Sequence, residues 1–203
     1  MAEPLDDSVR TVGILVFDEV EVLDFCGPFE VFASAERPGE PGRRVFRPLI
    51  LAERAETVRC RGGLLVVPHH TLADHPPLDI VLVPGGYGTR REVSNPVVLD
   101  WIAARRGEGA LTTSVCTGSF LLAAAGLLDG ARATSHWATL DGLRAAHPAI
   151  DVRDDERIVD LGEVVTSAGV SAGIDRALHL VRRLHGEEVA RATARDMEYD
   201  WRG

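Results

Sequence analysis

Several features that assign a chain to a protein class are missing from this sequence. Only 3 of the 203 residues are cysteine and no two form a CxxC pair, so a zinc ribbon and a dithiol redox motif are excluded. No run of about twenty apolar residues exists, as a membrane-spanning helix requires. The 31 acidic residues outnumber the 22 basic ones, giving a net charge of −9, which argues against nucleic-acid binding.

The composition is that of an ordinary globular domain. Hydrophobic residues make up 45% of the chain and charged residues 26%. The odd number of cysteines fits a reducing compartment, and the acidic segment Met1–Arg10 lacks the apolar run of a secretory signal. We therefore expect a cytoplasmic protein with residues 1–10 disordered. No repeat or linker divides the rest, so residues 1–203 are predicted to form a single domain.

Short apolar runs alternate with segments of helical periodicity. Such alternation predicts an α/β fold with a mostly parallel sheet covered by helices on both faces. Pro28 is expected in the first turn of a helix, and Ser94 is expected to cap another. The expected strands are 12–17, 45–51, 64–67, 79–83, 111–115, 133–135, 157–161 and 164–166, and the expected helices are 29–36, 94–106, 118–125, 136–146, 171–184 and 187–199.

Cys116 is the strongest candidate for a catalytic residue. It directly follows the strand 111–115 and precedes Thr117 and Gly118, where a helix begins. A residue at such a sharp strand-to-helix turn projects into the crevice where open α/β sheets bind ligands. The helix N-terminus is expected to lower the pKa of the thiol and favour the nucleophilic thiolate. The alternative is a small buried hydrophobe, but the strand–Cys–Thr–Gly–helix context favours catalysis.

Two further segments follow buried strands. Gly85, Gly86 and Tyr87 come after the strand 79–83 and are expected to approach a ligand, with the N–H groups of Gly86 and Thr117 forming an oxyanion hole. A plain glycine-rich turn is the alternative. Asp24 lies among apolar neighbours, which raises the pKa of a carboxyl group and suits proton transfer near neutral pH. A helix-capping aspartate is an equally good interpretation of Asp24.

Histidines offer weaker candidates. His136 follows a short expected strand and is either a base for Cys116 or a capping or core residue. His69 and His70 are adjacent, but no carboxylate or cysteine at ligand spacing supports a metal site. The sequence therefore predicts no metal.

These motifs resemble the ThiJ/PfpI superfamily, which is glutamine amidotransferase-like. Within it, the closest resemblance is to isonitrile hydratases. The matching segments are Leu82–Gly86, Ser114–Gly130, Ala133–Thr139 and Thr166–Val181, with Val22–Phe32 and Met197–Tyr199 pointing to the hydratases.

The resemblance carries several implications. It implies a flavodoxin-like three-layer sandwich, a homodimer and no cofactor. It assigns the nucleophile to Cys116, an acidic partner to Asp24 and an assisting role to Thr117. An isonitrile hydratase adds water to an isonitrile and yields an N-substituted formamide. Cys116 would attack the protonated carbon to give a thioimidate, with Asp24 as the proton donor, although direct activation of water by Asp24 is the alternative.

The sequence departs from the family pattern at three positions. Thr117 stands where family peptidases carry His, which argues against peptidase activity. Cys26 replaces a common Thr close to the presumed acid, where it would narrow the pocket or oxidise. Ser135 replaces the usual Thr before His136.

Two other functions compete with the hydratase. One is glyoxalase- or deglycase-like chemistry on reactive carbonyls, which uses the same thiolate and a carboxylate. The other is a ligand or thiol sensor, because the same domain forms the front half of AraC-type transcription regulators. The chain ends at Gly203 without a basic patch, so we expect no DNA-binding domain and rank a regulator below an enzyme.

Overall fold

The computed structural model describes residues 9–203. Most of the segment expected to be disordered, 1–10, lies outside the described residues, but Arg10 begins a strand and is ordered. The strands are β1 Arg10–Leu15, β2 Phe46–Ala52, β3 Val58–Arg59, β4 Leu65–Val66, β5 His70–Thr71, β6 Ile80–Val83, β7 Leu111–Val115, β8 Arg132–Ala133, β9 Asp151–Val152, β10 Ile158–Asp160 and β11 Val164–Ser167. The α-helices are α1 Val22–Ser34, α2 Thr89–Glu92, α3 Pro96–Gly107, α4 Gly118–Ala124, α5 Leu140–Ala146, α6 Ala172–His185 and α7 Glu187–Asp196.

A seven-stranded sheet forms the centre of the molecule, in the order β10-β11-β7-β6-β1-β2-β5. All pairs are parallel except β10 with β11, which form an antiparallel hairpin around Gly162. Val83 lies opposite Ser114 and Ser167 opposite Val115, so β6, β7 and β11 end at one edge. The segments that follow these three strands therefore meet where open parallel sheets bind ligands.

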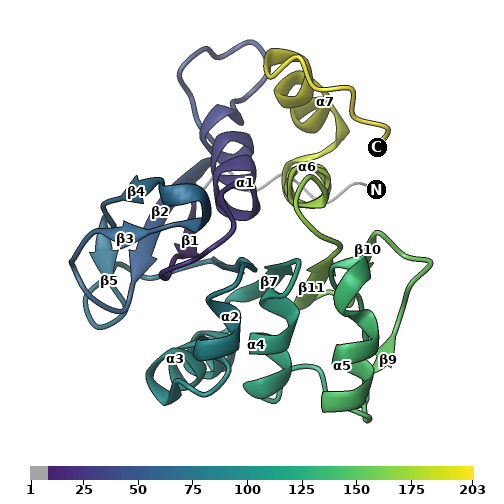
Figure 1. The fold of residues 1–203 in the computed structure, drawn as a ribbon. Helices are drawn as coiled ribbons and strands as arrows, with labels where there is room; N and C mark the ends of the chain where they lie inside the picture. Colours follow the sequence, from purple (N-terminus) through teal and green to yellow (C-terminus); the bar gives the residue numbers. More distant parts are fainter. Residues whose placement is uncertain (1–8) are drawn as a thin grey trace.

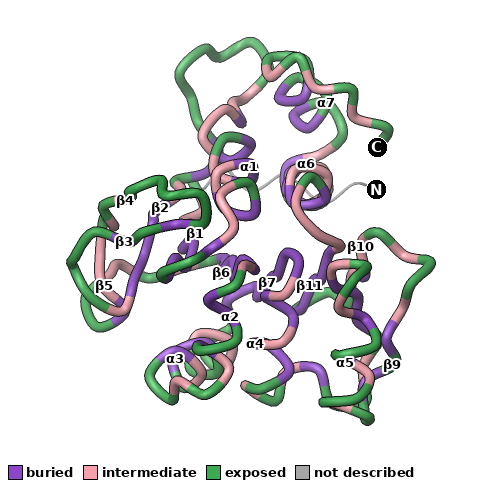
Figure 2. The backbone as a smooth tube through the Cα atoms, viewed as in Figure 1, coloured by how far each residue is buried: buried purple, intermediate pink, exposed green. Residues whose placement is uncertain are grey.

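Helices cover both faces of the sheet. Figure 1 shows α1, α6 and α7 on one face and α2 to α5 on the other. The strands between them are the most buried part of the chain: every residue of β6 and of β7 is buried, as Figure 2 shows for the central elements. The predicted α/β three-layer architecture is confirmed. None of the helices in residues 9–203 is long and apolar enough to span a membrane.

Helix α1 differs from its expected position because it packs closely against α6. It begins at Val22, seven residues before the expected start, and contains Pro28 in its interior rather than in its first turn. A Cβ on Gly27 would lie 2.8 Å from Cγ1 of Ile174, and one on Gly173 would lie 3.3 Å from Cγ of Pro28. Tertiary packing between the two helices therefore tolerates a proline that sequence rules place at a helix start.

Other local expectations need smaller corrections. The cap of α3 is Asn95, not Ser94, since the Asn95 side chain accepts a hydrogen bond from the N–H of Val97 at 3.1 Å. Strands β3, β5 and β9 and the short helix α2 were not expected from the sequence, because each is too short to show a period. The expected strand 64–67 is β4, which pairs with β3 outside the main sheet.

Candidate active site

Cys116 occupies the predicted sharp turn between β7 and α4. Its backbone φ is 56°, in the left-handed region that non-glycine residues rarely adopt. The Cys116 N–H lies 3.2 Å from the carbonyl oxygen of Ser167, at the end of β11. Only 7% of the residue is exposed. A Cβ on Gly85 would lie 2.8 Å from Cβ of Cys116, so the glycine after β6 makes room for the turn. Strained backbone of this kind is typical of functional sites.

Asp24 faces the thiol from the first turn of α1 and is 0% exposed. Its Oδ2 accepts a hydrogen bond from the N–H of Gly85 at 2.9 Å, and its Oδ1 accepts one from Val170 at 3.2 Å. Burial raises the pKa of Asp24 to about 7; Glu21 raises it further, while the two backbone bonds and the Cys116 thiol oppose the rise. The carboxyl group therefore exchanges a proton near neutral pH, as the sequence predicted, and it does not cap a helix.

The ionisation of Cys116 differs from the expectation. Burial raises the pKa of the thiol to about 12, and the negative charge of Asp24 raises it as well. Hydrogen bonds from the N–H and hydroxyl of Thr117 lower this pKa without reversing the effect of burial. The expectation of a lowered thiol pKa is therefore wrong, because burial and the charge of Asp24 outweigh the two hydrogen bonds from Thr117. The thiol is therefore protonated near neutral pH, with the carboxyl group of Asp24 beside it.

Thr117 belongs to a chain of hydroxyl groups beside the thiol. The N–H of Gly86 donates to Thr117 Oγ1 at 3.0 Å, and the Thr89 hydroxyl lies 3.2 Å from the same oxygen. The Gly86 N–H is therefore occupied, which leaves the N–H and the hydroxyl of Thr117 as the donors to the sulfur. Gly86 has φ 128°, so the close approach of this turn requires glycine.

The other predicted pocket residues differ in exposure and in their contacts. Tyr87 is exposed and its ring stacks under Arg61, whose guanidinium carbon lies 4.6 Å from the ring centroid. Arg61 also pairs with Glu21, so these residues form a polar rim beside Asp24. Cys26 is half-buried on α1, two residues beyond Asp24.

His136 has a structural environment. Its Nδ1 accepts a hydrogen bond from the N–H of Ala138 at 3.2 Å, and its ring packs against Gly169. The neighbouring Ser135 hydroxyl donates to the carbonyl oxygen of Cys116 at 3.0 Å. This motif therefore supports the Cys116 turn through its serine, and the capping interpretation of the histidine is the one that fits its contacts.

Three features of the site were not found from the sequence. Val170 has φ 54°, a rare conformation for a branched residue, and this directs its N–H to Asp24. Thr89 joins the hydroxyl chain. Arg176 is buried behind the site on α6. No local pattern marks these residues, because their roles depend on contacts between distant parts of the chain.

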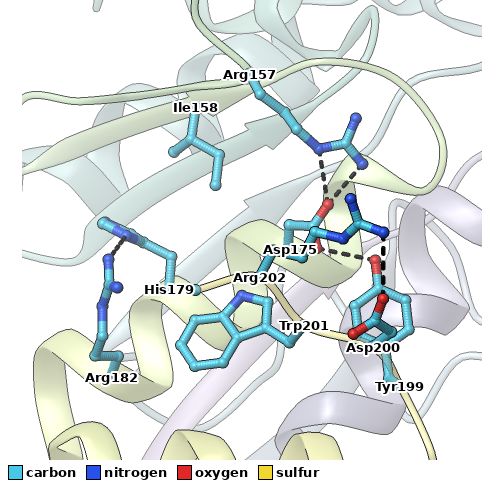
Figure 3. Close-up of a pocket in the computed structure, with 10 residues that line it drawn as sticks. Arg157, Ile158, Asp175, His179, Arg182, Tyr199, Asp200, Trp201 and Arg202 are labelled. Atoms are coloured by element: carbon cyan, nitrogen blue, oxygen red, sulfur yellow. Dashed lines mark hydrogen bonds and ion pairs between the residues drawn. The ribbon is translucent and has the colours of Figure 1, made fainter.

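A separate cavity of about 440 Å³ lies beside the C-terminal residues (Figure 3). Asp175 accepts hydrogen bonds there from Arg157 at 2.7 Å and from the Tyr199 hydroxyl at 2.9 Å. The guanidinium carbon of Arg182 lies 5.5 Å from the ring centroid of Trp201. Neither Cys116 nor Asp24 lines this cavity. Within residues 9–203 no group of three His, Cys, Asp or Glu side chains is arranged to hold a metal ion.

The comparisons with known proteins agree on one family. Residues 10–183 match the model of the DJ-1/PfpI family. The chain is 39% identical to isonitrile hydratase of Pseudomonas putida over 93% of this chain and 78% of that protein. It is also 30% identical to the HTH-type transcriptional regulator GbdR of Pseudomonas aeruginosa, over 97% of this chain but only 53% of the regulator.

Solved structures agree with these matches. A ThiJ/PfpI family protein from Pseudomonas syringae superposes with a TM-score of 0.83 at 34% identity, covering 94% of this chain and 75% of that one. Enzymes and regulators thus both occur among the relatives. The chain belongs to the DJ-1/PfpI family.

Proposed function

We propose that this protein is a cysteine-dependent enzyme that adds water to an isonitrile and releases an N-substituted formamide. The observation that carries the proposal is the buried pair of Asp24 and Cys116, in which the carboxyl group titrates near pH 7 and the thiol keeps its proton. Such a pair suits a substrate that must be protonated as it is attacked. The 39% identity to isonitrile hydratase of Pseudomonas putida supports the same chemistry.

The first step joins sulfur to carbon. The carboxylate of Asp24 takes the proton of the Cys116 thiol and delivers it to the terminal carbon of the isonitrile. The sulfur lone pair forms a bond to that carbon, and one carbon–nitrogen π bond is lost. The product is a thioimidate, R–N=CH–S, attached to Cys116. No net charge forms, which suits a site that is almost fully buried.

The second step releases the product. Asp24 accepts a proton from a water molecule, whose oxygen attacks the thioimidate carbon, and the nitrogen receives a proton. The tetrahedral carbon then expels the sulfur, which regains its proton, and R–NH–CHO leaves. Thr117 supplies the N–H and hydroxyl that stabilise negative charge on the sulfur in both steps.

We also infer that the protein forms a homodimer. Leu64, Leu65 and Val67 project from the β3–β4 arm with 46%, 56% and 71% of their surface exposed. The arm also carries Arg61, which pairs with Glu21 beside the site. Burying these apolar side chains against a second copy would remove them from water. Sedimentation of wild type and Leu65→Glu tests this, with a dimer expected for the wild type only.

The test of the proposed activity is product formation from cyclohexyl isocyanide, followed by NMR, for wild type and Cys116→Ala. Formamide from the wild type alone supports the proposal. Turnover of methylglyoxal without formamide formation would replace it with carbonyl chemistry. Absence of both activities in a folded protein would favour a ligand- or thiol-sensing domain, as the similarity to a regulator allows.

A further inference from the structure

Arg176 is a fully buried cation in the helix layer behind the active site. It lies on α6 and is 0% exposed. Its NH1 donates a hydrogen bond to the hydroxyl oxygen of Thr113 on β7 at 2.6 Å, and that hydroxyl in turn donates to the carbonyl oxygen of Val81 at 3.1 Å. Nε and NH2 of Arg176 have no hydrogen-bond partner within residues 9–203. The side chain is therefore only partly satisfied.

An arginine in this position is costly for folding. Unpaired buried donors lose their hydration without replacement, and apolar residues of similar volume often stabilise a protein when they replace buried charges. The neighbouring sheet-facing residues of α6, Ala177 and Leu180, are fully buried and apolar. A buried apolar residue would suit this surface, so the charge requires an explanation other than packing.

The hydrogen bond to Thr113 places the guanidinium against β7, three residues before Cys116. Long side chains on helices point toward the helix N-terminus. The N-terminus of α6 follows Val170, whose N–H binds Asp24. Gly173, three residues before Arg176, contacts Pro28 on α1, four residues after Asp24. Figure 1 shows α1 and α6 side by side on the same face of the sheet.

The charges around Asp24 leave Arg176 as its buried counter-charge among the described residues. Glu21, before α1, and Cys116, after β7, both add negative charge when ionised. Arg61 is half-exposed and pairs with Glu21. Burial lowers the pKa of Arg176 to about 9, and Asp24 opposes this change, so the guanidinium remains charged at neutral pH.

We propose that Arg176 is a positioning residue that stabilises, from the buried side, the single negative charge shared by Asp24 and Cys116. The inference rests on the acid–base pair of the proposed function, but not on the identity of the substrate. A nearby cation favours the ionised form of a carboxyl group. Without Arg176, Asp24 would hold its proton to a higher pH and would accept the thiol proton less readily.

The test is the rate of Cys116 alkylation by iodoacetamide as a function of pH. The parent protein carries both Cys26→Ser and Cys60→Ser, so that Cys116 is its single thiol. Arg176→Met removes the charge and keeps an apolar stem, and Arg176→Gln removes the charge while keeping a donor for Thr113. Both variants should move the acid limb of the profile upward by about 0.3 pH unit, which is about a twofold lower rate below the midpoint. Leu180→Ala, a control on the same helix, should lower stability and leave the limb in place.

Thermal unfolding provides the second measurement. Arg176→Met should melt at the same temperature as the parent or higher, because it relieves two unpaired donors. If Arg176→Met fails to fold, Arg176→Gln decides the question by its alkylation profile. Unshifted profiles in the folded variants would overturn the proposal and leave Arg176 as a tie between α6 and β7. Since alkylation needs no isonitrile, a failure of the hydratase assay does not affect this result.

Discussion

The active site and the C-terminal cavity differ in how their charged side chains are buried and paired. Around the cavity, Asp175 is bound by Arg157 and Tyr199, and the Arg157 side chain is 53% exposed (Figure 3). At the active site, Asp24 is 0% exposed, and among the described residues it receives hydrogen bonds only from backbone N–H groups and the thiol. Arg176, its proposed counter-charge, makes one hydrogen bond within residues 9–203.

This difference separates groups whose burial lowers stability and shifts their pKa values from groups that are solvated and paired. Exposed, paired charges contribute little and perturb little. Buried and incompletely paired groups cost stability but hold pKa values that are useful near neutral pH. We therefore expect substitutions at the active site to change the reactivity of Cys116. Substitutions around the C-terminal cavity should change neither activity nor stability appreciably.

The largest effect is expected from Cys116→Ala. Loss of the nucleophile should reduce formamide production at least about a thousandfold, because the covalent path is removed. The fold should persist, as checked by circular dichroism. Cys60→Ala, which also removes a buried free thiol, is the matched control and should keep its activity.

Asp24→Asn should come next, with kcat/KM lower by about 10²–10⁴-fold through loss of proton transfer. In the wild type, activity should fall as the pH drops through about 7, the pKa of Asp24. The variant should lose this acid limb. An unchanged limb in Asp24→Asn would assign the titration to another group.

The raised pKa of Asp24 also makes the free energy of unfolding depend on pH. The folded pKa of Asp24, about 7, lies above the ordinary value of 3.8 for an aspartate, so the native state binds the proton more tightly than the unfolded chain. Stability from this group is present at low pH and is lost as the pH rises toward 7. Asp24→Asn should therefore gain stability relative to wild type, on the order of 3 kcal/mol, between pH 4 and pH 8. Urea unfolding at the two pH values measures it.

Glu21→Gln should shift the pH profile in the direction opposite to Arg176→Met and by a larger amount, because Glu21 is the charged side chain that raises the pKa of Asp24 most. Removing its negative charge lowers the pKa of Asp24, so the acid limb should move down by about half a pH unit. The pH profile of Cys116 alkylation measures this shift. An upward shift would contradict the charge arrangement described for the site.

The smallest effects belong to the cavity. Arg202→Ala removes a fully exposed partner of Asp200, with side chains 89% and 85% exposed. The free energy of unfolding should change by less than about 0.5 kcal/mol, and kcat/KM should not change. A loss of activity in this variant would erase the distinction between the two regions.

The sequence predicted features that depend on neighbours along the chain. The alternation of strands and helices, the turn at Cys116 and the raised pKa of Asp24 all follow from local pattern. It could not predict contacts between distant residues: Val170 binds Asp24 from 146 positions away, and Arg176 binds Thr113 from 63 positions away. The degree of burial at Cys116, which keeps its thiol protonated, also arises from these contacts.

The most direct test of the central claim is mass spectrometry of the wild-type protein quenched during turnover of cyclohexyl isocyanide. The account predicts a peptide containing Cys116 whose mass is increased by one molecule of substrate, and its disappearance as substrate is exhausted. Continued formamide production with no adduct, and with activity retained in Cys116→Ala, would contradict covalent catalysis by Cys116.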